Sequence, residues 1–361
     1  MSHSRKEMIS FFLTTKCNLD CIYCYTNKNS NAHACQTLDY EFAKAGIDEY
    51  YQTEFAHHVR FFGAGEPTME LSLMQKILAY AKSKDPGTTS ELQTNGCFDR
   101  NTALWIAENI DIVWISSDGV PAIQDYYRHM PGGGGSSDIL EKNIKYLAAN
   151  AKGMTGIRAT ITDTNVHNQI DLVKYFAELG IRNFWVDPIF PAIDGVESYE
   201  DLDMEIFTEE FLRAVRYAYK HGMTYGSILT CNFDEPCEYA CRACLPVPHL
   251  TTDGYVSACD MALFGNDANH MNVFIYGKWN STEKKIEYFP DKIKFLQSRK
   301  LSNMPHCQKC DAGELCRGYC LGEVMNETKD LFGCKNKICG SIRKLLNELS
   351  EEERKYSFSH P

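Results

Sequence analysis

Three cysteines lie close together near the start of the chain, as Cys17, Cys21 and Cys24. They follow the apolar run 9–13, which predicts a buried strand that ends in a loop. Iron–sulfur clusters are usually closed by four thiolates, so a loop with three thiolates in CxxxCxxC spacing could hold three irons of a four-iron cubane and leave the fourth open. An open iron can bind a small molecule. A structural zinc loop completed from elsewhere, or buried cysteines without a metal, would also fit the spacing alone.

The same loop, with Tyr23 before its third cysteine, resembles the signature of the radical S-adenosylmethionine (SAM) enzymes. In that family the open iron binds the amino and carboxylate groups of SAM, and electron transfer to the cofactor gives a 5′-deoxyadenosyl radical that abstracts a substrate hydrogen. The cofactor carries this chemistry, and the protein supplies orientation and a dry pocket. The resemblance also implies a reductant, such as flavodoxin or ferredoxin, as a partner.

Length and composition set the class of protein. The chain has 361 residues, enough for one large domain and a smaller one, and 44% of them are hydrophobic. The net charge of −11 argues against a broad basic surface for nucleic acid. No apolar run approaches the ~18–20 residues of a membrane span, and the polar start is no secretory signal, so we expect a cytoplasmic protein. Sixteen cysteines in such a chain favour metal ligands over disulfides.

Apolar, β-branched and aromatic runs alternate with helical patterns as far as residue 222. Strands are predicted near 9–13, 59–62, 90–93, 112–116, 157–161 and 183–186, and helices near 38–52, 71–82, 101–108, 137–149, 169–179 and 209–221. Six strand–helix units predict an α/β fold with a parallel sheet. The resemblance makes this a partial (β/α)6 TIM-type barrel, open on one side, with its chemistry at the C-terminal strand ends. We expect the barrel over 1–225, a cysteine-rich domain over 226–345 and a tail over 346–361.

Glycine and polar residues follow the second and third strands. Gly63 and Gly65, in the segment Gly-Ala-Gly-Glu-Pro, would let the backbone approach a ligand closely, although the segment could be a simple turn. This segment resembles the GGEP motif of the family, which implies that Glu66 and these glycines hold the amino group of SAM; Ala64 replaces the second glycine. Asn95, in a Thr-Asn-Gly turn, is similar to a family segment that lines the barrel mouth.

Polar residues also mark the fourth and fifth strands. Ser116 and Asp118 stand in a Ser-Ser-Asp-Gly segment, where they could bind a ribose or an amino-acid carboxylate, or form a turn with a helix cap. The surrounding passage 114–137 looks like the peptide-modifying maturases of the family. Arg158 is a charge inside an otherwise apolar strand, so it needs a partner. The resemblance supplies the carboxylate of SAM, which a guanidinium can grip; a salt bridge to an internal acid is the alternative.

Eleven cysteines lie between Cys231 and Cys339, where the only sustained helical pattern is 342–349. Such a region cannot build a large core alone, so metal sites are expected to hold it together. Its spacings are Cx₉Gx₄C and Cx₂Cx₅Cx₃C, which zinc ribbons could also explain.

Together these spacings resemble the SPASM extension of peptide-modifying radical enzymes, which carries two further [4Fe–4S] clusters. The resemblance assigns Cys244, Cys259 and Cys320 to the first auxiliary cluster, with either Cys237, which we favour, or Cys241. If the upstream thiol is free, that cluster has an open iron. The second cluster takes Cys307, Cys310, Cys316 and either Cys334 or Cys339. The chain would then hold three clusters.

Asp260 directly follows Cys259 and could act as a general base. It resembles the base of sulfatase maturases, although a turn or capping aspartate is the alternative. The resemblance as a whole implies a radical SAM oxidoreductase that acts on a peptide or protein, and we expect a thioether or C–C cross-link in a ribosomally made peptide. The rivals are anaerobic sulfatase maturation, which converts Cys or Ser to formylglycine, and a non-catalytic iron–sulfur or zinc scaffold.

Overall fold

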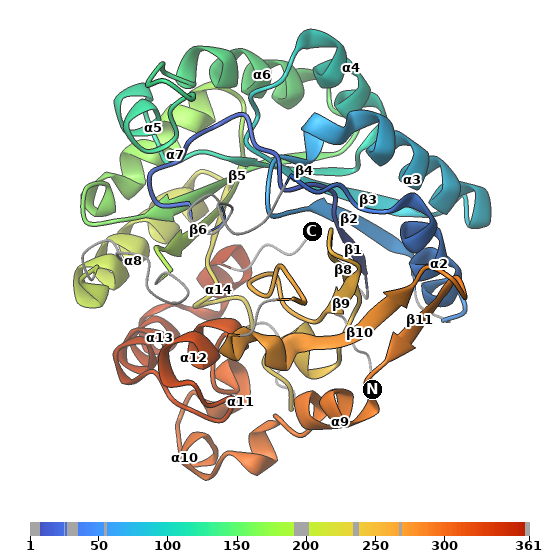
Figure 1. Ribbon diagram of the computed structural model, residues 1–361. Coiled ribbons are helices and arrows are strands. Elements are labelled where there is room, and N and C mark those ends of the chain that lie inside the picture. Colours follow the sequence, from blue (N-terminus) through green and yellow to red (C-terminus); the bar gives the residue numbers. More distant parts are fainter. Residues whose placement is uncertain are drawn as a thin grey trace.

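A computed structural model describes residues 8–24, 26, 35–53, 56–190, 202–233, 238–266 and 269–357. Strands and helices alternate through the first two thirds of it, and short helices follow (Figure 1). Within this part of the chain the strands form one eleven-stranded sheet in the order β11-β10-β9-β8-β1-β2-β3-β4-β5-β6-β7.

Strands β1 to β8 pair in parallel, and the last three strands are antiparallel. Their bounds are β1 (Ile9–Phe12), β2 (His58–Phe62), β3 (Thr89–Thr94), β4 (Ile112–Ser116), β5 (Met154–Ile161), β6 (Asn183–Pro188), β7 (Thr224–Gly226), β8 (His249–Leu250), β9 (Tyr255–Ser257), β10 (Ile275–Asn280) and β11 (Lys285–Tyr288). The six predicted strands are confirmed, each to within a few residues at its ends.

Helices cover the outside of the parallel strands. They are α2 (Tyr40–Tyr50), α3 (Leu71–Lys84), α4 (Arg100–Asn109), α5 (Pro121–Tyr127), α6 (Ser137–Asn150), α7 (Gln169–Glu178) and α8 (Met204–Lys220). Aspartates begin three of them: Asp39, Asp99 and Asp203 each accept a hydrogen bond from a backbone N–H of the first turn. The α/β partial barrel predicted from the sequence is confirmed.

Strand β2 alternates between an apolar outer face and a polar inner face. In β2, Val59 and Phe61 are fully buried in the main hydrophobic core, whereas His58 and Arg60 are buried among charged groups. Successive strand residues point to opposite faces, so these two residues face the barrel interior. The interior beside β2 therefore holds charged groups that need one another as partners.

The cysteine-rich segment shares the barrel's sheet instead of forming a separate layer. Strand β8 pairs with β1, through Ser10 with His249 and Phe11 with Leu250. Helices α9 (Pro290–Gln297), α10 (Pro305–Gln308), α11 (Gly313–Cys316), α12 (Leu321–Thr328) and α13 (Asn336–Glu348) gather at the bottom of Figure 1. The helix expected at 342–349 is found within α13, but the expectation that it would be the only sustained helix of this region was wrong, because α9 to α12 are too short to show a clear helical period.

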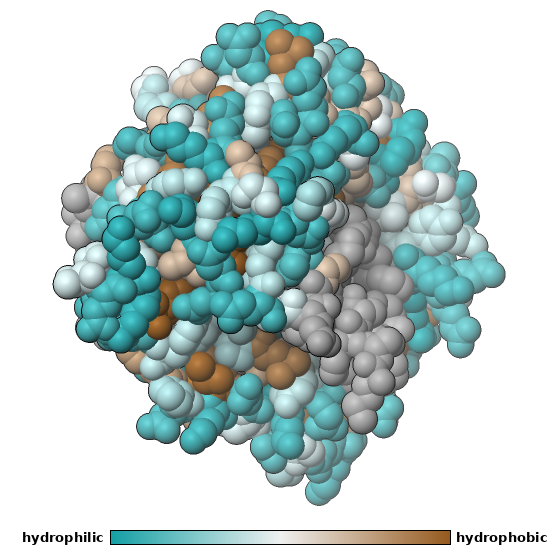
Figure 2. Space-filling view, turned by 90° about the vertical axis from the view of Figure 1, so that its right-hand side faces the viewer, coloured by the Kyte–Doolittle hydropathy of each residue, from teal (hydrophilic) through white to brown (hydrophobic). Residues whose placement is uncertain are grey.

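The predicted tail contains a packed helix. Helix α14 (Glu351–Ser357) lies against α8 and β7, where the Thr230 hydroxyl donates to the Ser357 carbonyl. No helix of the described residues is long and apolar enough to cross a membrane. On the face shown in Figure 2, hydrophilic residues predominate and apolar residues form small separate groups.

Candidate functional site

The three cysteines of the first loop lie together at the C-terminal end of β1. Backbone bonds hold the loop on the end of α5: the Asp20 N–H donates to the His129 carbonyl at 2.9 Å, and the Ile22 N–H to the Tyr127 carbonyl at 3.0 Å. Burial raises the pKa of Cys17 to about 11 and that of Cys21 to about 12, and neighbouring thiols of the loop add to both shifts. Thiols this hard to ionise become good ligands only when a metal displaces their protons.

Asp118 fixes this loop to the barrel. Its carboxylate is fully buried and accepts bonds from the Tyr23 hydroxyl, from Arg128 Nε at 2.9 Å and from the Thr160 N–H at 2.9 Å. Arg128 also stacks over the Tyr23 ring. Both Tyr23 and Asp118, predicted to contact the cofactor, thus have structural partners, and their contact with SAM remains a prediction.

Gly65 and Glu66 lie directly against the cysteine loop. The Glu66 N–H donates to the Lys16 carbonyl at 2.7 Å, and a Cβ on Gly65 would come within 2.1 Å of the same oxygen. A Cβ on Gly63 would find ordinary contacts at 3.6 Å, so only Gly65 is required by close approach.

The Glu66 carboxylate is buried at the ends of β2 and β3. Its Oε1 accepts from the Thr68 N–H at 3.0 Å and from the Thr94 hydroxyl at 2.7 Å, while Oε2 accepts from the Asn95 N–H at 2.7 Å. Burial raises the pKa of Glu66, and these bonds oppose the rise. Among the described residues Oε2 has this one donor, so it retains acceptor capacity that suits an ammonium group.

Asn95 and Ser116 complete the mouth of the barrel. Asn95 Nδ2 donates to Asn18 Oδ1 at 2.7 Å and lies 3.9 Å from Cys17 Sγ, which places Asn95 against the first loop as predicted for a mouth residue. Ser116 is buried at the end of β4, in register with Arg158 on β5.

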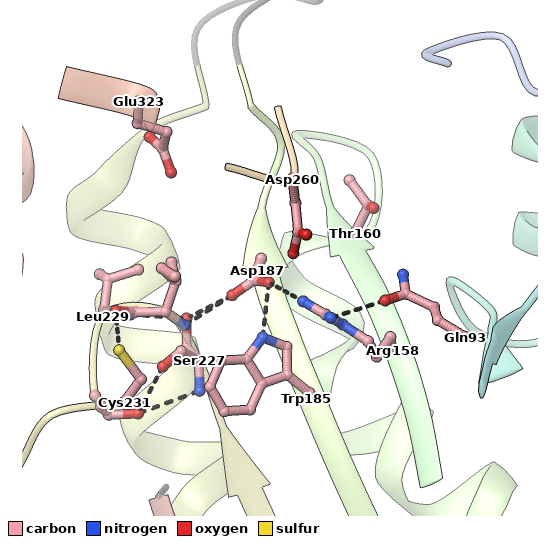
Figure 3. Close-up of polar contacts among 12 residues, drawn as sticks. Gln93, Arg158, Thr160, Trp185, Asp187, Ser227, Leu229, Cys231, Asp260 and Glu323 are labelled. Atoms are coloured by element: carbon pink, nitrogen blue, oxygen red, sulfur yellow. Dashed lines mark hydrogen bonds and ion pairs between the residues drawn. The ribbon is translucent and has the colours of Figure 1, made fainter. Parts of the chain in front are cut away.

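Arg158 is paired with an internal acid. Its Nη2 lies 3.2 Å from Asp187 Oδ2, and its Nη1 donates to Gln93 Oε1 at 2.9 Å (Figure 3). Trp185 Nε1 also donates to Asp187, at 2.7 Å. The structure therefore contains the salt bridge considered as the alternative for Arg158, and binding of the SAM carboxylate by Arg158 remains a prediction.

Asp260 is held by the Arg60 guanidinium and the His249 imidazole in the barrel interior. Arg60 Nη1 donates to both of its carboxylate oxygens at 2.9 Å, and His249 Nδ1 lies 3.1 Å from Oδ1. Burial alone would raise the pKa of Asp260, but Arg60 and His249 hold it well below its usual range. A carboxylate so stabilised as an anion is a weak base. This geometry disfavours the predicted general base.

The later cysteines form two groups. The first auxiliary group contains Cys241, Cys244, Cys259 and Cys320: the Cys241 thiol raises the pKa of each of the other three, alongside the effect of burial. Cys237, the ligand favoured from the sequence, lies outside the described residues, and Cys241 occupies the upstream position among those described.

The second auxiliary group contains Cys307, Cys310, Cys316, Cys334 and Cys339. Burial raises the pKa of Cys307 to about 11, and Cys310, Cys316 and Cys334 add to it. Cys334 Sγ and Cys339 Sγ are 3.3 Å apart, so both candidates for the last ligand reach the same place. A cavity of about 40 Å³ separates the two groups and is lined by Cys241, Cys316 and Cys320, among others.

The donor set fits iron–sulfur clusters. In the part of the chain that the structure describes, no three His, Cys, Asp or Glu side chains are arranged to hold one metal ion. In a cubane each iron takes its own thiolate, so the ligands need not converge on one point, and all the grouped donors are soft thiols.

Sequence reasoning missed the partners of Arg158 and Asp260. Gln93, Asp187, Arg60 and His249 are polar residues at inward positions of β3, β6, β2 and β8. Strand alternation was the signal that could have found the first three.

Comparison with known proteins defines the class. Residues 11–162 match the family described as the Radical SAM superfamily. This part of the chain is thus a radical SAM domain, and the resemblance of the first cysteine loop to the radical SAM enzymes is confirmed.

Three curated relatives are similar to it. An uncharacterized protein of Methanocaldococcus jannaschii is 29% identical over 182 residues, or 50% of this chain and 61% of that one. The Fe-coproporphyrin III synthase of Methanosarcina barkeri is 31% identical over 174 residues, or 46% and 40%. The chain thus spans less than two thirds of these two relatives. The radical SAM cyclopropyl synthase TigE of Paramaledivibacter caminithermalis is 22% identical over 96% of this chain and 75% of that one.

Two solved structures share the fold along nearly the whole chain. Native anSMEcpe with bound AdoMet (SAM) and Kp18Cys peptide has a TM-score of 0.72 and 19% identity, covering 95% of this chain and 100% of that one. Streptococcus suis SuiB bound to precursor peptide SuiA has a TM-score of 0.67 and 16% identity, covering 93% and 76%.

Proposed function

We propose that the protein is a radical SAM maturase that removes a hydrogen atom from a side chain or backbone position of a peptide or protein, and that the product is a thioether or C–C cross-link in a ribosomally made peptide. When bound at an iron–sulfur cluster, SAM supplies a 5′-deoxyadenosyl radical for such a step. The observation that carries the proposal is the three-thiol loop packed against Gly65 and Glu66 at the mouth of the barrel, with two larger thiol groups behind it.

The residues of the mouth would divide the binding of SAM among them. Cys17, Cys21 and Cys24 would hold the first cluster. Glu66 Oε2, with its remaining acceptor capacity, would bind the amino group. Arg158 would bind the carboxylate by exchanging or sharing its partner Asp187.

The two auxiliary groups would each hold a further [4Fe–4S] cluster. Cys241, Cys244, Cys259 and Cys320 provide four thiols for the first, which would leave it fully ligated. The second has five thiols for four places, with Cys334 and Cys339 as alternatives. These clusters would exchange electrons with the substrate and with a reductant such as flavodoxin or ferredoxin.

A peptide substrate is supported by the similar structures. Both anSMEcpe and SuiB were solved with peptides bound, and each shares the fold of nearly the whole chain. The name of TigE, cyclopropyl synthase, describes C–C bond formation, and that relative aligns over 96% of this chain. These observations favour a peptide cross-link as the product class.

Formylglycine formation is the second candidate, because anSMEcpe has the higher TM-score of the two structures. It requires a base near the oxidised carbon, and Asp260 is engaged by Arg60 and His249. A sulfatase-type cysteine peptide separates the two candidates, since an aldehyde product reacts with a hydrazine and a cross-link does not.

The proposal is tested by measuring iron, sulfide and zinc in anaerobically purified protein, together with 5′-deoxyadenosine formed from SAM and dithionite. We expect about twelve irons, falling to about eight with loss of SAM cleavage in the Cys17/Cys21/Cys24→Ala variant. Zinc in place of iron, or no SAM cleavage by the iron-loaded protein, would leave the scaffold hypothesis standing.

A further inference from the structure

A buried arginine lies between the two auxiliary thiol groups. Arg299, just after α9, has no solvent exposure and is among the largest fully buried side chains. Its Nε donates to the Leu331 carbonyl at 3.2 Å and its Nη2 to the Gly318 carbonyl at 2.8 Å, while Nη1 donates to the Arg317 carbonyl. The guanidinium therefore has good hydrogen-bond partners, all of them neutral.

The positive charge of Arg299 has no described counter-charge. Across residues 8–24, 26, 35–53, 56–190, 202–233, 238–266 and 269–357, no carboxylate forms an ion pair with it. Hydrogen bonds to carbonyls satisfy the N–H groups but do not neutralise the charge, and a fully buried charge without compensation is costly. The protein tolerates this cost beside the segment that carries Cys316 and Cys320.

The carbonyls that Arg299 contacts belong to the peptide that joins the two groups. Arg317 and Gly318 lie between Cys316 of the second group and Cys320 of the first. Two hydrogen bonds thus place the Arg299 guanidinium on the three-residue link between a thiol of one group and a thiol of the other.

The backbone of this peptide is shaped around the guanidinium. Arg317, Gly318 and Tyr319 all have positive φ, at 54°, 84° and 67°. A Cβ on Gly318 would meet Arg299 Nη2 at 2.4 Å. The Tyr319 N–H donates to the Cys316 carbonyl at 3.1 Å. Arg317 and Tyr319, the two non-glycine residues on either side of Gly318, are strained in this left-handed conformation. The conformation turns the Arg317 and Gly318 carbonyls toward the cation.

We propose that Arg299 is the shared counter-cation of the two auxiliary clusters, tuning the reduction potential of both through the Cys316–Cys320 peptide. This inference rests on the proposed function, because it requires both clusters. A [4Fe–4S] cluster with four thiolate ligands is negatively charged in both oxidation states and gains one more negative charge on reduction by one electron. A buried cation close to both clusters stabilises the reduced form of each, and salt screens it little.

The test is an EPR-monitored redox titration of the anaerobically purified full chain, repeated in the Cys17/Cys21/Cys24→Ala variant to assign the auxiliary signals. Arg299→Met keeps the apolar stem and removes the charge. We expect it to move the reduction equilibrium of both auxiliary clusters at least tenfold toward the oxidised form, which is about 59 mV for a one-electron couple. Arg299→Lys, which keeps the charge, should restore most of the potential. Lys300→Met is the matched control, because it removes a half-exposed charge from the adjacent residue.

Each outcome decides the inference. Lowered potentials in Arg299→Met with recovery in Arg299→Lys support it, as does loss of auxiliary iron in Arg299→Met alone. Unchanged potentials, an equal effect of Lys300→Met, or loss of iron in both Arg299 variants would overturn it and leave Arg299 as a structural clamp. Wild-type protein without the auxiliary irons would instead contradict the proposed cofactor complement, so the two failures are distinguishable.

Discussion

Replacing Asp260 with Asn separates a structural carboxylate from a catalytic base. The Asp260 carboxylate accepts from Arg60 at 2.9 Å through both oxygens and lies 3.1 Å from His249. Breaking a buried ion pair usually costs about 3–5 kcal/mol. Arg60 keeps a second partner, Glu91 at 3.4 Å, so we expect Asp260→Asn to lower the free energy of unfolding by about 2–3 kcal/mol. At roughly 2–4 °C per kcal/mol this lowers the melting temperature by about 5–10 °C.

Arg60→Met should lower the free energy of unfolding further, because it leaves two carboxylates of the barrel interior, Asp260 and Glu91, without the guanidinium that both contact. The double variant Arg60→Met/Asp260→Asn should have a free energy of unfolding about 1–3 kcal/mol higher than Arg60→Met alone, because the unpaired Asp260 charge is removed. The assay is thermal unfolding followed by circular dichroism in sealed anaerobic cells, on samples of equal iron content, together with 5′-deoxyadenosine formation.

The reasoning would be refuted by an Asp260→Asn variant that melts with the wild type and cleaves SAM normally but forms no product. That result would show that the carboxylate contributes little to the interior network and acts on the substrate. A variant that is less stable and still modifies its peptide would remove Asp260 from the chemistry.

Three further predictions concern the thiol loops and the barrel interior. Gly65→Ala should displace the first loop and lose about four irons, because the new methyl group would meet that loop's backbone at 2.1 Å, whereas Gly63→Ala, with contacts at 3.6 Å, should keep them. Cys241→Ser should likewise lose about four irons from the first auxiliary group, while Cys231→Ser, outside both groups, should lose none; equal losses would contradict the grouping. Burial acts to raise the pKa of Glu91, but the neighbouring His58 and Arg60 hold it at about 2. The ionised Glu91 therefore adds about 3 kcal/mol to the free energy of unfolding above about pH 4.5, and this contribution is lost as the pH falls toward 2. The melting temperature of Glu91→Gln should therefore lie below that of the wild type at pH 6 and approach it at pH 3, and a constant difference would argue against the depressed pKa.

The barrel could be predicted from the sequence because its strands and helices are long and regular. All six predicted strands and their helices are present. Outward-facing apolar residues of the strands, such as Val59 and Phe61, form one hydrophobic core with apolar residues of the helices that cover them. The cysteine loop and the Gly65–Glu66 contact were also accessible, because their spacing is local.

The interior of the barrel was less accessible. Arg158 was recognised as a charge that needs a partner, but Asp187 lies on the next strand and only the register of β5 with β6 brings the two together. Asp260 was predicted as a base because its sequence neighbour is Cys259. Its ion-pair partner Arg60 comes from a strand 200 residues away in sequence, and His249 comes from the nearby β8. The second half of the chain was hardest, because its helices are short and its thiols are grouped by loops whose backbone no periodic pattern encodes.

The position of β1 has a consequence for how the chain is made. As the first strand in sequence, β1 is paired on one side with β2 and on the other with β8, so it lies in the middle of the finished sheet. Contacts this distant in sequence close slowly, and β8 leaves the ribosome long after β1. The loop with Cys17, Cys21 and Cys24 follows β1 directly. Its hydrogen-bond partners at the end of α5 are synthesised much earlier than β8. In a nascent chain the loop can therefore bind its anchor on α5 before β1 pairs with β8. Iron delivery to this loop need not wait for the cysteine-rich half to be synthesised.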